Sequence, residues 1–180
     1  MSPPAATGSQ PGQVAPVSSV PELSDTLSQA LYDLIAQQPF FKGLNTQQLK
    51  LLTNSALEME FETGATIFEE GSPANRFYLI LKGRVVLLSE MEDRNMIPIQ
   101  TLGPGDELGW SWLLPSSYLL LSARALEPTR TIFFYGPRLR EQCEQDHELG
   151  YQIMKRIAEA AIRCLRATQR RLSGCTDTSS

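Results

Sequence analysis

The chain lacks the composition that marks several large classes of protein. Its 180 residues include 16 Lys and Arg against 20 Asp and Glu, so the strong basic excess typical of nucleic-acid-binding proteins is missing. No apolar run approaches the ~18 residues that a membrane-spanning helix needs. The N-terminus, MSPPAATGSQ, has neither the basic start nor the apolar centre of a secretory signal. We therefore expect a cytoplasmic protein without a membrane span.

Histidine and cysteine are also scarce. The single histidine, His147, excludes a multi-histidine metal centre, and haem ligation by this residue is an unfavoured alternative. Cys143, Cys164 and Cys175 are too few and too widely spaced for a disulfide framework or a four-thiolate metal site. The sequence shows no paired carboxylates placed for acid–base chemistry and no glycine-rich nucleotide loop. No metal site is predicted, and the chain is expected not to be an enzyme.

Residues 1–23 are rich in Pro, Ser, Ala, Gly and Gln and carry almost no charge. Such a segment buries too little apolar surface to offset the entropy lost on ordering. We predict a disordered arm here, with a docking peptide for a partner as the alternative. After it, Ser24 with Asp25 is predicted to cap one helix, and Asn45 to cap a second over residues 46–56.

The middle of the chain has the pattern of many short strands. Leu57, Met59 and Phe61 alternate with glutamates, which predicts a half-buried first strand. Further strands are predicted at 66–68, 77–82, 84–90, 96–102, 122–127 and 129–135, with a hairpin tip at 91–95. Short strands at regular spacing, separated by glycine turns, are typical of a β-sandwich or barrel.

The helical period returns from Pro137. Residues 137–150 are predicted to form one or two short helices, and residues 151–172 one long helix. Its main apolar positions are Ile153, Ile157, Ala160, Ala161, Cys164 and Thr168, with Ile162 and Leu165 on an adjoining face. This much apolar surface predicts two neighbours, the β domain and a second copy of the helix in a homodimer. Packing entirely within one chain is the alternative.

These elements predict an α+β fold: a β-roll or jelly-roll barrel of short antiparallel strands with N-terminal helices and a long C-terminal helix. The predicted division places the arm at 1–23 and the N-terminal helices with the β roll at 24–137. C-terminal hinge and dimerisation helices follow at 138–172, and a polar tail at 173–180.

One segment, GSPANRFYLILKGRVVLL, carries a resemblance to a known family. Its residues Gly71, Ala74, Phe77, Tyr78, Ile80, Gly83 and Val85 match the pattern G-x-x-A-x-x-F-Y-x-I-x-x-G-x-V. The pattern resembles that of the cyclic nucleotide-binding domain of catabolite-activator-type regulators and cyclic-nucleotide-gated proteins. GPGDELG at 103–109 is similar to that family's G-x-G-D-x-F-G. The resemblance covers about residues 28–172, and GWSWL with ARALEPTR is similar to stand-alone bacterial members.

In that family the ligand binds to a short helix and loop, the phosphate-binding cassette, which corresponds here to GDELGWSWLLPSSYLLLSARA. Two charged positions differ. The glutamate that hydrogen-bonds the ribose corresponds to Trp110, and the arginine that pairs with the cyclic phosphate corresponds to Leu119. A buried phosphate without a cationic partner is costly, and leucine cannot replace a guanidinium. We therefore expect weak or no binding of cyclic AMP or cyclic GMP in the usual pose.

Three interpretations of this cassette remain. Trp110, Trp112 and the Leu119–Leu121 run could fill the cavity, which would leave a ligand-free adaptor or scaffold. The pocket could instead take an apolar or aromatic ligand, or a cyclic nucleotide through non-standard contacts. No cofactor is assigned. The candidate ligand-binding residues are Gly109, Trp110, Ser111, Trp112, Leu119, Ser122 and Arg124.

The resemblance implies a regulatory or sensor domain that acts through an unidentified protein partner. Residues 155–171 are locally basic, which suits the dipole of a helix; an acidic protein, nucleic-acid or lipid surface is the alternative. In the catabolite-activator relatives a helix-turn-helix domain follows the long helix. Only SGCTDTSS follows Leu172, so direct reading of DNA is not expected.

Overall fold

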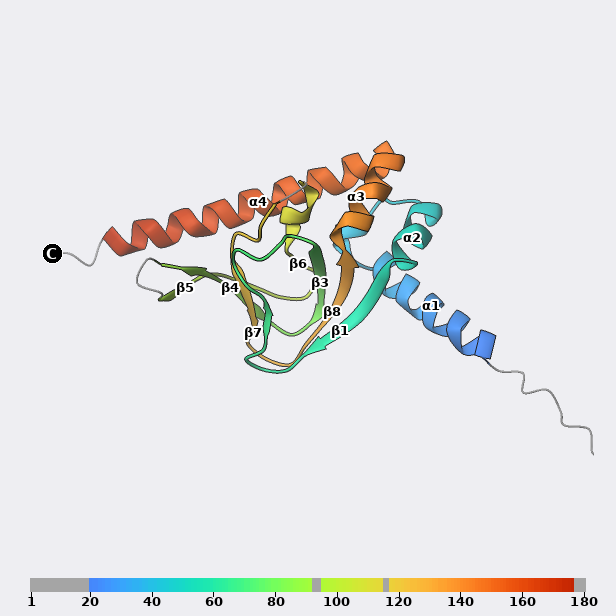
Figure 1. The fold of residues 1–180 in the computed structure, drawn as a ribbon, viewed down its shortest axis with the longest axis horizontal. Helices are drawn as coiled ribbons and strands as arrows, with labels where there is room; N and C mark the ends of the chain where they lie inside the picture. The colour runs from blue at the N-terminus through green and yellow to red at the C-terminus, as the bar shows by residue number, and fades with distance from the viewer. Residues whose placement is uncertain (1–19, 92–94, 115–116, 177–180) are drawn as a thin grey trace, which may run out of the picture.

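The computed structural model describes residues 20–176 apart from 92–94 and 115–116. Helices from the start and from the end of the chain pack together at one end of a β roll, and the long C-terminal helix passes along one side of the roll (Figure 1). This arrangement confirms the predicted α+β fold. The predicted division of the chain stays a prediction, and the predicted arm and tail lie largely outside the described residues.

The N-terminal part forms α1 (Val20–Ala36), the 3₁₀ turn η1 (Pro39–Phe41) and α2 (Thr46–Thr53). Asn45 caps α2 as predicted: its side chain accepts the N–H of Gln48 at 2.9 Å, and the Gln48 side chain accepts the N–H of Asn45 at 3.1 Å. The predicted cap at Ser24 and Asp25 is wrong, because α1 begins earlier, at Val20. Proline at position 21 suits a first helical turn, where its missing N–H has no intrahelical acceptor.

Two antiparallel sheets make up the roll in the described ranges. Their strands are β1 (Ala56–Phe61), β2 (Thr66–Phe68), β3 (Arg76–Lys82), β4 (Val85–Glu90), β5 (Met96–Leu102), β6 (Glu107–Leu108), β7 (Ser122–Ala125) and β8 (Thr129–Tyr135). One sheet has the order β1-β8-β3-β6 and the other β2-β7-β4-β5. The two-residue β6 was not predicted, because its pairing with β3 depends on tertiary placement rather than on a local pattern.

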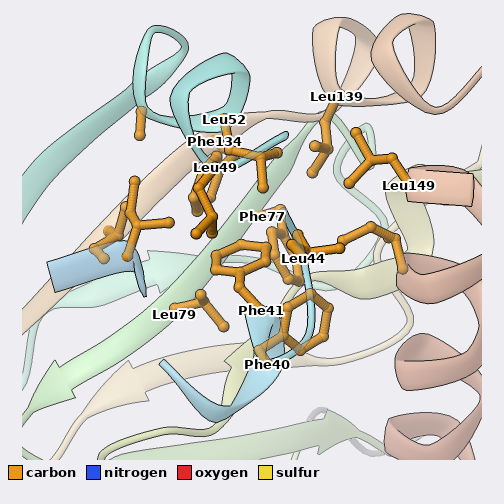
Figure 2. Packing of buried hydrophobic residues seen from close by; sticks show 14 of the residues in the cluster. Phe40, Phe41, Leu44, Leu49, Leu52, Phe77, Leu79, Phe134, Leu139 and Leu149 are labelled. Atoms are coloured by element: carbon orange, nitrogen blue, oxygen red, sulfur yellow. The ribbon is translucent and has the colours of Figure 1, made fainter. Parts of the chain in front are cut away.

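Buried side chains form two separate cores. In β3, Phe77 and Leu79 face the first core while Tyr78 and Ile80 face the second, as the two-residue period of a strand requires. The outer core packs the helices against the first sheet and includes Phe40, Phe41, Leu52, Phe77, Phe134, Leu139 and Leu149 (Figure 2). Ile153 of the C-terminal helix belongs to the same core. The roll core lies between the two sheets and includes Ile67, Phe68, Tyr78, Ile80, Val85, Leu87, Leu108, Leu119 and Ala123.

Strand β1 is confirmed, but its predicted burial is wrong. Leu57 is 62% exposed and Met59 is 37% exposed. The reason is position: β1 ends the strand order of its sheet and pairs with β8 alone in the described part of the chain. On the polar positions, Arg130 of β8 bonds to Glu58 at 2.6 Å and lies 3.5 Å from a carboxylate oxygen of Glu60.

The C-terminal helices are α3 (Gly136–Gln145) and α4 (His147–Thr176), so the long helix begins four residues before its predicted start. Asp146 joins them and accepts the N–H of Leu149 at 3.0 Å and the side-chain amide of Gln48 at 2.9 Å. The predicted inner face of α4 is confirmed at Ile153, Ile157 and Ala160, which are buried. Within the described ranges, no helix combines the length and apolar character that a membrane crossing requires.

Candidate functional site

The candidate site is the central part of the predicted cassette, residues 107–114 and 117–121. After β6, Gly109 has a φ of 73°, and a Cβ at this position would clash with the carbonyl oxygen of Arg76 in β3. The chain then forms the 3₁₀ helix η2 (Trp110–Leu113). Glycine at position 109 is therefore needed both for the left-handed turn and for the close approach of the cassette to β3.

The end of the cassette is held by backbone pairing. Beyond residues 115–116, the N–H of Leu119 donates to the carbonyl oxygen of Ser72 at 2.9 Å, and the N–H of Gly71 donates to that of Leu119 at 2.9 Å. The Leu119 side chain is 3% exposed and belongs to the roll core. The side chain at position 119 is thus apolar and lies in the interior of the roll.

A small cavity of about 30 Å³ lies between the cassette and strands β2 and β4. Its lining residues are Phe68, Leu87, Gly109, Trp110, Ser111, Leu119, Leu120 and Leu121. Pockets for small ligands usually measure about 300–1,000 Å³, whereas about 30 Å³ is one water molecule's share of liquid volume. Apolar side chains therefore occupy most of the space at this point, whereas a second hollow of about 470 Å³ lies beside Leu119 and is also lined by Phe68 and Arg76.

Trp112 does not line this cavity and lies instead in the outer core. Its ring centroid is 5.8 Å from that of Phe77, and its Nε1 atom has no hydrogen-bond partner in the described part of the chain. The start of α3 packs closely on it, since a Cβ added to Gly136 would lie 2.6 Å from the Cβ of Trp112. Trp112 therefore joins the cassette to α3.

Ser122 and Arg124 line a different hollow. Ser122 is buried, and its Oγ accepts the N–H of Glu70 at 2.9 Å, whereas Arg124 is exposed. The hollow measures about 290 Å³ and is also lined by Glu69, Glu70 and Glu90. Three carboxylates around one guanidinium make this hollow a poor place for an anion.

The predicted ligand-binding residues thus fall into two groups. Those that the structure brings together around the cavity are Gly109, Trp110, Ser111 and Leu119. Those that it places elsewhere are Trp112, Ser122 and Arg124. A role of any of them in ligand binding stays a prediction. In the described ranges, no group of three His, Cys, Asp or Glu side chains is placed to hold a metal ion.

Two polar contacts of the cassette were not predicted from the sequence. Glu107 of β6, whose side chain is 6% exposed, forms an ion pair with Arg163 of α4, which is 47% exposed. Burial raises the pKa of Glu107 above its ordinary value, and the Arg163 guanidinium opposes this rise. At the C-terminal end of η2, Arg140 of α3 donates to the carbonyl oxygens of Trp112, Leu113 and Leu114. The one signal for these contacts in the sequence was the acidic residue Glu107, which stands at a strand position in GDELG.

Comparison with known proteins identifies the family. The sequence model of the cyclic nucleotide-binding domain matches residues 58–146. A solved cyclic nucleotide-binding protein from Geobacter metallireducens is 32% identical, with a TM-score of 0.65 over 77% of this chain and 97% of that one. The chain belongs to the cyclic nucleotide-binding domain family.

Two more distant relatives are regulators. A CRP-like cAMP-activated global transcriptional regulator from Mycobacterium tuberculosis is 25% identical over 141 residues, which make up 78% of this chain and 61% of the relative. The chain thus spans less than two thirds of that protein. The regulatory subunit of a cAMP-independent protein kinase A from Trypanosoma brucei shares the fold, with 20% identity and a TM-score of 0.67 over 85% of this chain and 53% of that one.

Proposed function

We propose that this chain is a regulatory domain that works without a cyclic nucleotide in the usual pose and passes its output to a partner protein. The observation that carries the proposal is the burial of Leu119, at the position where the family resemblance expects the phosphate-binding arginine. Leu119 borders a cavity with room for about one water molecule, and it also lines a second hollow of about 470 Å³ with Phe68 and Arg76.

The energetics support this proposal. A cyclic nucleotide would need space now taken by Trp110 and Leu119, and its phosphate would face a leucine side chain. Leaving a charge unpaired in an apolar site costs several kcal/mol. The backbone N–H groups of the four-residue η2 are too few to replace a guanidinium that donates two parallel hydrogen bonds.

A cyclic nucleotide bound through non-standard contacts is the weaker alternative. Arg124 was the nearest candidate for the phosphate, but it lines a hollow shared with Glu69, Glu70 and Glu90. Those carboxylates would repel the phosphate. The trypanosomal relative is described as a cAMP-independent regulatory subunit, which is compatible with use of this fold in regulation without that ligand.

The proposed output surface is the outer side of α4. Tyr151, Met154, Ile162 and Leu165 are exposed and follow steps of three, eight and three residues along the helix, a spacing close to a heptad stripe. Ile153 and Ile157 on the other side pack into the outer core. We propose that this stripe pairs with a second copy of α4, and that the resulting homodimer presents the domain to its partner.

A variant that restores the family's charged residues tests the function. Trp110→Glu combined with Leu119→Arg should create cyclic AMP binding, which a melting-temperature shift and titration calorimetry would detect. Trp110→Glu combined with Leu120→Arg is the matched control, because it adds the same charges but places the arginine at the next residue, which is 62% exposed. A ligand at about 100 times its dissociation constant adds about 2.7 kcal/mol of stability.

The wild-type chain should show no shift with cyclic AMP, cyclic GMP or cyclic dinucleotides. A wild-type shift at micromolar nucleotide would contradict the proposal. If the folded double variant does not bind either, the assignment of positions 110 and 119 to the ribose and phosphate contacts is wrong.

A further inference from the structure

We propose that strand β1 is a docking edge for an extended peptide of a partner protein in which basic and apolar residues alternate. The peptide adds a strand to the first sheet beside β1, on the side away from β8. This docking edge deepens the proposed function, since it gives the partner a surface and a chemistry, and it rests on the proposal that such a partner exists.

The outer edge of β1 has backbone groups available for pairing. Within the described ranges, β1 ends the strand order of its sheet and has β8 on one side only. Every second residue of an antiparallel strand turns both its N–H and its C=O to the same side, so alternate residues of β1 turn theirs away from β8. Residues 57–60 are all exposed. An open edge of this kind is a template for another strand.

The side chains of β1 give its two faces different chemistry. Leu57 stands opposite Phe133 of β8, which packs against the roll core, and Met59 lies on the same face of the strand. Their exposed fractions of 62% and 37% leave apolar surface at the margin of that core. Glu58 and Glu60 lie on the opposite face. A strand that pairs here therefore needs apolar side chains on one face and polar ones on the other.

Glutamates dominate the polar face of β1. Arg130 of β8 bonds to Glu58 at 2.6 Å and lies 3.5 Å from a carboxylate oxygen of Glu60. The Glu60 side chain is nevertheless 78% exposed, and Glu62, directly after the strand, is exposed as well. Three carboxylates thus lie along this edge with one guanidinium beside them. A lysine or arginine of an added strand would stand opposite Glu60, and opposite charges across a strand pair stabilise it.

The same pattern argues against two other occupants. A second copy of β1, paired antiparallel with its apolar residues on one face, would set glutamate opposite glutamate, which destabilises a strand pair. Residues 1–19 of this chain contain no Lys or Arg, so they offer no cation to Glu60. Charges on an edge strand commonly block pairing with like strands. Because the charges of β1 are all negative, they favour a strand of opposite charge.

Fluorescence anisotropy with a labelled octapeptide of alternating Lys and Val tests the docking edge on the full chain at physiological ionic strength. The peptide should bind saturably, and binding should slow hydrogen exchange in residues 56–61. An isomeric peptide with four Lys followed by four Val has the same charge but cannot divide its side chains between two faces. It should bind about tenfold more weakly, because several cross-strand pairs are lost.

Glu60→Lys should weaken binding of the alternating peptide about fivefold, because an attractive cross-strand pair becomes a repulsive one. Glu144→Lys is the matched control: it makes the same charge change at an exposed position of α3 and should leave the affinity unchanged. Equal binding by the two variants would overturn the inference, and so would equal binding of the two Lys–Val isomers. Slower exchange confined to residues outside β1 would place the peptide on another surface and would also overturn it.

A separate titration of the wild type with cyclic AMP distinguishes the two proposals. A melting-temperature shift with cyclic AMP would contradict the ligand-independent function and leave the β1 edge standing. Absence of binding by the alternating peptide would overturn the β1 edge alone.

Discussion

Gly136→Ala is a substitution in which two opposing effects can be compared from the structure. The residue opens α3, and its φ lies outside the range that favours glycine, so alanine can adopt the backbone. Within a helix, alanine is favoured over glycine by about 1 kcal/mol at most. Against this, the new Cβ would lie 2.6 Å from the Cβ of Trp112 and 3.2 Å from a backbone carbon of Asn75.

The steric effect should win. Overpacking of a close-packed site costs about 1–3 kcal/mol, and here one neighbour is backbone and the other is a fully buried tryptophan. Because the new contact of 2.6 Å is closer than any real Cβ contact, the cost should lie in the upper part of that range, at about 2–3 kcal/mol. We therefore expect a net loss of about 1–2 kcal/mol in the free energy of unfolding once the helix gain of about 1 kcal/mol is subtracted. Urea denaturation followed by circular dichroism measures it. Gly103→Ala, where an added Cβ has no atom within 4 Å, is the control.

Tryptophan fluorescence should change together with stability in Gly136→Ala, because the clash displaces the cassette through Trp112. An alanine variant as stable as wild type, with unchanged fluorescence, would refute the close packing of α3 on η2. A similar loss in Gly103→Ala would show that the effect is not specific to this contact.

Three further predictions concern assembly, pH and thiol reactivity. Leu165→Asp should turn the proposed homodimer into a monomer, as measured by analytical ultracentrifugation. Leu57→Asp, which changes an exposed leucine of β1, should leave the protein a dimer. A dimeric Leu165→Asp variant would contradict the proposed α4 interface. Asp146 accepts hydrogen bonds from the N–H of Leu149 and from the side-chain amide of Gln48, and these lower its pKa from the ordinary 3.8. The ionised carboxylate therefore stabilises the fold above pH 3.8, and this stabilisation is lost as the pH falls through the lowered pKa of the folded state. Asp146→Asn should therefore flatten acid unfolding in this range, and an unchanged pH profile would contradict the assignment. Burial raises the pKa of Cys143 from 9.0 to about 12, so with the other two cysteines changed to serine its alkylation at pH 8 should be roughly a thousandfold slower than for an ordinary thiol. Labelling at the ordinary rate in the folded chain would refute this.

The parts of the fold that depend on local patterns could be predicted from the sequence. Alternation in β3 gives a strand with two buried faces, and the cap at Asn45 follows from the hydrogen bonds of its own side chain. The exposure of Leu57 and Met59 could not be predicted. Alternation indicates that a strand has two faces, but whether another element covers one of them depends on the strand's place in the sheet.

The same distinction holds for the cassette. The positions of Trp110 and Leu119 follow from a resemblance that runs without a gap, and both line the cavity. Trp112 lies two residues from Trp110 but belongs to a different core, because η2 turns its side chains to different neighbours. The contacts of Arg140 join residues that are 26 to 28 positions apart in sequence, and no spacing rule connects such residues.

The division of the buried residues into two cores has a consequence for how the chain unfolds. One short segment contributes to both, with Trp112 in the outer core and Leu119 in the roll core. A fluctuation that released this segment would expose apolar surface from both cores at once, whereas fraying of α1 or of the end of α4 exposes little. We therefore expect the segment to belong to the most slowly opening cooperative unit of the domain, in contrast to the low-stability loops that usually surround a ligand site.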